Sequence, residues 1–260
     1  MNEIYNEWLK ERGNYKKLKD WNPHLPELII KNYPTSDNKM MGHVNRIITG
    51  PPGLGKSIYA YKIGAKTHYL FNGYTKVDEE EYSYKYSLDQ LMYRPQQLFD
   101  KIRVQRQRNE PELFGCIDDG SVHMGRQLFD QDRETYRKLQ GIVPTLREDF
   151  TGFLVTTVIL NMLAKPLREF VRHKVIIKPM AELKSMRRLA VHYERWYFPD
   201  DIRFRMLVPF QEKFSSLCPE PFYSWYHEKK MKALNEYMAD LERKPVKPSG
   251  GEDVEEDSGT

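Results

Sequence analysis

Residues 50 to 57 read Gly-Pro-Pro-Gly-Leu-Gly-Lys-Ser, a complete match to the phosphate-binding pattern G-x-x-x-x-G-K-[ST]. Its glycines allow backbone conformations that other residues avoid, so successive N–H groups can turn towards phosphate oxygens. The pattern predicts that Lys56 reaches the outer phosphates of a nucleoside triphosphate and that the Ser57 hydroxyl binds magnesium. The predicted nucleotide contacts are Gly50, Pro51, Pro52, Gly53, Leu54, Gly55, Lys56, Ser57 and the next residue, Ile58.

A second polar cluster follows the apolar run 113–117, which is predicted to form a strand that ends in two acids. Asp118 is placed to complete the magnesium site from the tip of a strand beside the phosphate-loop strand. Asp119 comes next, where a carboxylate can orient and deprotonate the attacking water. The alternative is a strand that ends in an ordinary polar Asp-Asp-Gly turn.

Two threonines end another apolar run, residues 152–157. A polar residue at that point would lie between the acidic strand and the γ-phosphate, so Thr156 or Thr157 could sense that phosphate, and Thr157 is the candidate site residue. An equally weighted alternative is that β-branched threonines simply suit a strand.

The elements that must position these residues follow from local patterns. A strand is expected at 44–49 and a helix from 57 onward, on either side of the loop. Residues 82–87 alternate like an exposed strand, and Ser87 and Gln90 have capping-box spacing. Further along the chain we expect a helix from Pro95 to about 107, a helical region 121–150 bent at Pro144, and a strand at 173–178.

Length and charge indicate how the chain is organised. The 260 residues fit one main domain at 43–243, preceded by an N-terminal helical arm at 1–42 and followed by an acidic disordered tail at 244–260. The net charge is +4, but five acids against one lysine lie beyond Pro245, which leaves +8 for the rest. A basic body tolerates a nucleic-acid partner without requiring one.

Composition also excludes several classes. Two cysteines, Cys116 and Cys218, argue against a disulfide framework and fit a reducing cytoplasm. The N-terminus does not read as a secretory signal, and the most apolar stretch, 153–164, is too short and polar to span a membrane. The seven histidines are scattered, and neither a zinc motif nor a Gly-x-Ser-x-Gly elbow occurs.

The order of these elements resembles a known family. The phosphate-loop strand, an intervening strand, the Asp-Asp strand, the Thr-ended strand and the strand at 173–178 are similar to the additional-strand catalytic-acid branch of P-loop ATPases, which includes AAA+ proteins and FtsK, HerA and Zot-like DNA motors. The segment 117–123, Ile-Asp-Asp-Gly-Ser-Val-His, and a later aromatic hairpin resemble ATPases of archaeal viruses and plasmids, some described as DnaA-like. The resemblance covers residues 46–226, and the phosphate loop is its most specific part.

Two features depart from the family pattern. The usual second acid is Glu, whereas this chain has the shorter Asp119. AAA+ proteins follow the fifth strand with a small helical lid, but residues 188–196 and 202–209 here predict a β-hairpin. The hairpin favours the motor-like or virus-specific branch.

The resemblance implies that an arginine from this chain or a neighbouring copy reaches the γ-phosphate. Arg168 is the first candidate because it follows the Thr-ended strand, and Arg172, Arg187 and Arg188 are others by position. Each could equally be a solvated surface charge.

The predicted hairpin mixes aromatic and basic residues, which could stack on bases and neutralise phosphates. The alternative is that the aromatics pack on the sheet while the arginines stay in water. These residues are Arg188, Tyr193, Arg195, Trp196, Tyr197, Phe198, Arg203 and Arg205. The closing helix, 221 to about 241, carries an apolar stripe that reads as a core face.

We therefore expect an α/β fold, a three-layer and mostly parallel P-loop NTPase sheet with an appended hairpin and C-terminal helix. The expected function is magnesium-dependent ATP hydrolysis coupled to an action on nucleic acid, with DNA favoured. A homo-oligomer in the cytoplasm, or in an infected host cell, is also expected. A nucleoside or small-molecule kinase and a non-hydrolysing, nucleotide-controlled assembly module are the alternatives.

Overall fold

The computed structural model describes residues 18–34, 42–76, 78–126, 132–170, 173–180, 186–198 and 201–243. Within them, eight strands form one sheet in the order β2-β3-β4-β1-β5-β6-β7, and β8 also pairs with β6. The strands are β1 (Val44–Thr49), β2 (Leu91–Met92), β3 (Glu112–Ile117), β4 (Phe150–Thr156), β5 (His173–Pro179), β6 (Arg187–Phe198), β7 (Asp201–Leu207) and β8 (Gln211–Ser215).

Helices cover both faces of this sheet. They are η1 (Leu18–Asp20), α2 (His24–Lys31), α3 (Lys56–Phe71), α4 (Glu79–Gln90), α5 (Pro95–Arg108), α6 (Gly120–His123), α8 (Arg133–Ile142), η2 (Val143–Thr145), α9 (Leu146–Asp149), η3 (Leu160–Met162), α10 (Lys165–Phe170) and α11 (Phe222–Arg243). The region 121–150 is thus several short helices, and its expected break is the 3-10 turn at Pro144.

The pairing within the sheet confirms the predicted fold class. The run β2-β3-β4-β1-β5 is parallel, whereas β6 is antiparallel to β5, β7 and β8. The acid-bearing strand β3 does not adjoin the phosphate-loop strand β1, as expected from sequence, because β4 lies between them. This is the mostly parallel sheet of a P-loop NTPase, with one extra strand separating the loop from the acids.

Alternating side chains on the central strands build two hydrophobic cores. Ile48 and Leu154 face the cluster formed with α2, α3 and α4, whereas Ile47 and Val155 face the cluster formed with α5, α8 and α10. Successive residues of a strand point to opposite faces, so strands buried on both sides read as continuous apolar runs. The sheet is therefore the middle layer of three.

The described N-terminal segment belongs to the domain. Leu18, Trp21, Leu25 and Ile29 are buried in the core beside α3. A separate arm up to residue 42 is therefore wrong for residues 18–34, whose apolar side chains pack on α3. The helix expected near the N-terminus and the acidic tail lie outside the described residues.

Residues 82–87, expected as an exposed strand, lie within helix α4. Three acids in its first turn favour the helix dipole, and Ser83, Tyr84 and Ser87 share its buried face at helical spacing. The Ser87 hydroxyl donates to the Tyr61 carbonyl, so it is not a helix cap.

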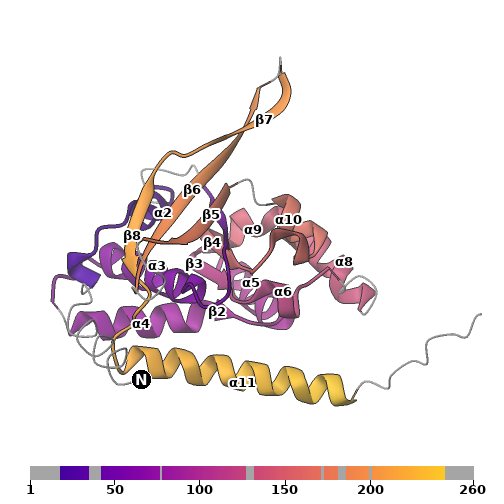
Figure 1. The fold of residues 1–260 in the computed structure, drawn as a ribbon. Helices are drawn as coiled ribbons and strands as arrows, with labels where there is room; N and C mark the ends of the chain where they lie inside the picture. Colours follow the sequence, from indigo (N-terminus) through magenta and orange to yellow (C-terminus); the bar gives the residue numbers. More distant parts are fainter. Residues whose placement is uncertain are drawn as a thin grey trace, which may run out of the picture.

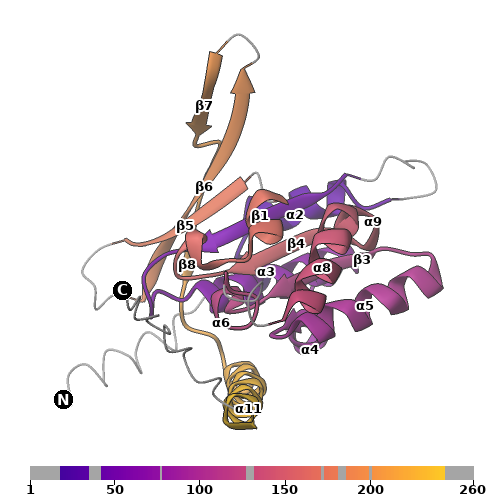
Figure 2. The same ribbon diagram turned by 90° about the vertical axis from the view of Figure 1, so that its right-hand side faces the viewer.

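The predicted hairpin is confirmed as β6 and β7, whose paired backbones project from the sheet on the side away from α11 (Figures 1 and 2). Side chains from Arg195 outward lie outside the described residues. Sequence patterns missed β8, which pairs with the first half of β6.

Candidate nucleotide-binding site

The phosphate loop joins β1 to α3 through three glycines with positive φ. Gly50, Gly53 and Gly55 have φ values of 149°, 76° and 83°. A Cβ at Gly50 would lie 2.9 Å from the Ile177 carbonyl oxygen, and one at Gly55 would lie 2.7 Å from the Ser216 Cβ. The loop is thus pressed against β5 and the segment after β8, and both glycines are required there.

Lys56 and Ser57 open helix α3 at the end of this loop. The Lys56 ammonium is buried and donates to the Pro51 carbonyl oxygen at 3.0 Å. Burial lowers the pKa of Lys56, Asp119 and Asp118 oppose that effect, and the nearby Lys230 adds to it. The Ser57 side chain hydrogen-bonds to Asp118, so the loop and the acid strand meet directly.

Asp118 is fully buried just beyond the end of β3. Its Oδ1 accepts from the Thr156 hydroxyl at 2.6 Å and its Oδ2 from the Tyr226 hydroxyl at 3.1 Å. Burial and the neighbouring Asp119 raise the pKa of Asp118, while Lys230, Ser57 and Thr156 oppose the rise. The carboxyl therefore sits in a preformed ring of hydroxyl groups.

Asp119 adopts a left-handed conformation, with φ 50°, at the start of α6. Its backbone N–H donates to the Thr156 hydroxyl oxygen at 2.9 Å, so one threonine contacts both acids. The Asp119 Oδ2 lies 2.5 Å from the Lys230 ammonium, and the Asp119 side chain is 28% exposed. This acid, unlike Asp118, has access to water.

The two threonines of β4 have different partners. Thr156 contacts the acid pair, whereas the Thr157 hydroxyl donates to the Ile159 carbonyl at 3.1 Å. The Thr157 N–H bonds the Ile48 carbonyl, which continues the ladder to β1. In this structure Thr156 is thus the threonine at the acids.

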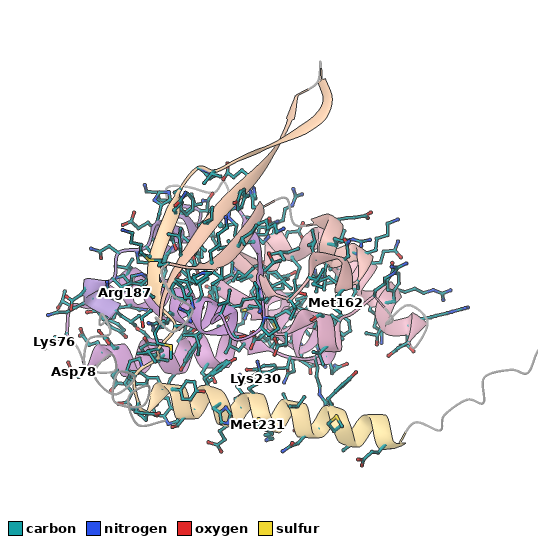
Figure 3. The ribbon with its side chains drawn as sticks, viewed as in Figure 1. Lys76, Asp78, Met162, Arg187, Lys230 and Met231 are labelled. Atoms are coloured by element: carbon teal, nitrogen blue, oxygen red, sulfur yellow. The ribbon has the colours of Figure 1, made fainter. Side chains whose placement is uncertain are left out.

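Helix α11 supplies the side chains that sequence patterns missed. Tyr226 and Lys230, one helical turn apart, reach Asp118 and Asp119 from its inner face. Figure 3 shows Lys230 on the side of α11 that faces the domain. The available signal was a lysine on the same helical stripe as the buried Tyr226 and Ala233.

Several contacts fix α11 beside α4 and α5. Phe222 stacks on Tyr84 with ring centroids 4.2 Å apart. The Lys229 ammonium donates to the Leu88 carbonyl. Glu236 pairs with Arg94 at 3.5 Å, so the helix is fixed both before and after Lys230.

The arginine candidates occupy other elements. Arg168 is half-buried on α10, and Arg188 is buried at the start of β6, where it donates to the Arg187 carbonyl. Arg172 lies outside the described residues. A cation that the structure does place at Asp119 is Lys230.

Membrane spans and metal clusters are both absent from the part of the chain that the structure describes. No helix there is long and apolar enough to cross a membrane. No group of three or more His, Cys, Asp or Glu side chains in that part could hold a metal alone. Magnesium beside phosphates needs only one or two carboxylates, because the phosphates supply other ligands.

No family model and no curated protein matches the sequence. Distant solved structures include the ATPase domain of a DnaB-like helicase, with 8% identity, covering 64% of this chain and 80% of that one, at a TM-score of 0.36. A KaiC-like protein from Pyrococcus horikoshii OT3 has 13% identity, with 74% and 99% covered, at 0.38. The N-terminal domain of zonular occludens toxin from Neisseria meningitidis has 16% identity, with 70% and 98% covered, at 0.37.

Proposed function

We propose that this protein binds ATP with magnesium and hydrolyses it. The observation that carries the proposal is the meeting of the phosphate loop with an acid pair. Three positive-φ glycines precede α3, and the Ser57 side chain at its first turn bonds Asp118. A turn that merely joined a strand to a helix would need neither feature.

The residues present fit a triphosphate and a magnesium ion. The 16-residue helix α3 begins at the loop, so its positive end favours anions there. Lys56 supplies a cation, and Ser57 and Asp118 supply the hydroxyl and carboxylate oxygens that magnesium prefers. Bound magnesium would neutralise phosphate charge during hydrolysis.

Each side chain then has a role. Asp119 would orient a water and accept its proton, because its carboxylate is partly exposed and its backbone is fixed by Thr156. Thr156, rather than Thr157, has the contacts to relay the state of the site to both acids. Arg168 stays a candidate for the arginine that the family resemblance implies.

We further propose an action on nucleic acid, with DNA as the favoured ligand and a homo-oligomer as the working form. A basic body supports this proposal, as does the projecting β6–β7 pair, whose sequence mixes aromatic residues with arginines. A viral or plasmid origin and action in the host cytoplasm remain part of the same proposal.

The test measures ATP binding and hydrolysis with and without single- and double-stranded DNA. We expect binding and turnover in the wild type, stimulation by DNA, and loss of both activities in Lys56→Ala. The exposed Lys178→Ala, on neighbouring β5, is the matched control. Equal ATP binding and turnover by Lys56→Ala and the wild type would contradict the proposal.

The alternatives give different results in the same assay. Turnover that requires an added acceptor would favour a kinase. Binding without turnover, together with a nucleotide-dependent change in oligomer mass, would favour an assembly module. Turnover without any DNA effect would keep the ATPase and remove the nucleic-acid role.

A further inference from the structure

Four charged side chains share the candidate site. The Lys230 ammonium lies 2.5 Å from Asp119 Oδ2 and 4.0 Å from Asp118 Oδ2. Lys56 interacts electrostatically with both acids and with Lys230. Two ammonium groups thus balance two carboxylates, and this balance requires no bound ligand.

We propose that Lys230 exchanges partners when the nucleotide binds: it leaves Asp119 and bonds the outermost phosphate of the triphosphate. This inference rests on the proposed function. It assigns to the C-terminal helix of the same chain a cation that contacts the substrate.

The proposed role of Asp119 requires such an exchange. A carboxylate oxygen bonded to an ammonium at 2.5 Å is engaged and is a poor acceptor for a water proton. Hydrolysis therefore needs Lys230 to move. A magnesium–triphosphate complex brings positive charge to the acids and negative charge to the lysines, so every charge keeps a partner after the exchange.

The movement is confined to one side chain. Lys230 is 32% exposed, and lysine has a flexible four-carbon stem. The helix itself is fixed by Phe222 on Tyr84 and by Glu236 on Arg94. Release of the whole helix would also expose the buried Tyr226 and Ala233.

A binding measurement tests the exchange without turnover. The variant Lys230→Met is compared with the wild type for affinity towards a non-hydrolysable triphosphate analogue and towards the diphosphate, both with magnesium. A hydrogen bond between charged groups predicts that Lys230→Met lowers the triphosphate preference about 10- to 100-fold. We expect Lys230→Arg to retain much of it, and Lys232→Met, an exposed lysine on the same helix, to retain it fully.

Amide hydrogen exchange over residues 222–236 provides a second readout. We expect these amides to stay protected when the analogue binds, because α11 remains docked. In turnover assays Lys230→Met is expected to be slower than the wild type. Faster exchange together with faster turnover of Lys230→Met would instead identify α11 as an inhibitory cover and overturn the proposal.

The controls separate this inference from the proposed function. If Lys56→Ala loses nucleotide binding while Lys230→Met keeps the full triphosphate preference, only the role of Lys230 fails. If the wild type binds no nucleotide, the proposed function fails first. Circular dichroism of Lys230→Met checks that a lost preference does not reflect unfolding.

Discussion

The polar side chains on the two sides of helix α3 are paired in different ways. At the phosphate loop, Asp119 and Lys230 are partly exposed and pair with each other. On the β8 side, Tyr59, His192 and Glu212 are buried together. The Tyr59 hydroxyl donates to Glu212 Oε2 at 2.5 Å and lies 3.0 Å from His192 Nε2.

This second cluster, Tyr59–His192–Glu212, is closed. Glu212 Oε1 also accepts the Leu25 N–H at 2.8 Å, which ties α2 to the sheet. Burial acts to raise the pKa of Glu212, but hydrogen bonds from His192, Tyr59 and Leu25 outweigh it and lower the pKa. The contrast indicates that groups able to exchange partners keep contact with water, whereas groups that hold elements together lose it.

Asp119→Asn tests the open side of this contrast. Loss of a general base predicts a fall in turnover of about 10²- to 10⁴-fold, because an amide cannot accept the water proton. Nucleotide affinity is expected to stay near that of the wild type. Single-turnover hydrolysis measures the rate, and Asp100→Asn on the exposed face of α5 is the control. Unchanged turnover would remove Asp119 from the mechanism.

Glu212→Ala tests the closed side. Removing one partner from a buried pair predicts a loss of about 3–5 kcal/mol in the free energy of unfolding. Urea denaturation measures this loss, with the exposed Glu27→Ala as the control. Turnover per folded molecule is expected to stay unchanged. A loss of activity without a loss of stability would show that the two clusters are not distinct in role.

Lys62 extends the contrast to pH. Its buried ammonium donates to the Ser215 and Leu217 carbonyls, and burial lowers the pKa of Lys62 from 10.5 to about 8. Between these values the unfolded chain holds the extra proton, so rising pH favours the folded state. Relative to Lys62→Met, the wild type is expected to gain about 2 kcal/mol between about pH 7 and 9.5. A pH-independent difference in urea denaturation would contradict this prediction.

Sequence patterns located the loop, the acid pair and the strand class, because these depend on local spacing. The repeated glycines and the apolar runs that end in polar residues are short-range signals. Tyr226 and Lys230 were missed as site residues because α11 follows the loop by more than 160 residues, and only tertiary packing brings it to Asp118. Similarly, Tyr82–Ser87 alternates like a strand, but packing on α3 and the acidic first turn make it helical.

Strand β6 has a mechanical consequence. Its twelve residues span about 40 Å, and its first half is bonded to β5 and β8, the neighbours of the phosphate loop. Its outer half pairs with β7 beyond the sheet (Figure 1). A stiff ribbon pivoting at its base acts as a lever, so a slight tilt beside the loop becomes a wide sweep at the tip.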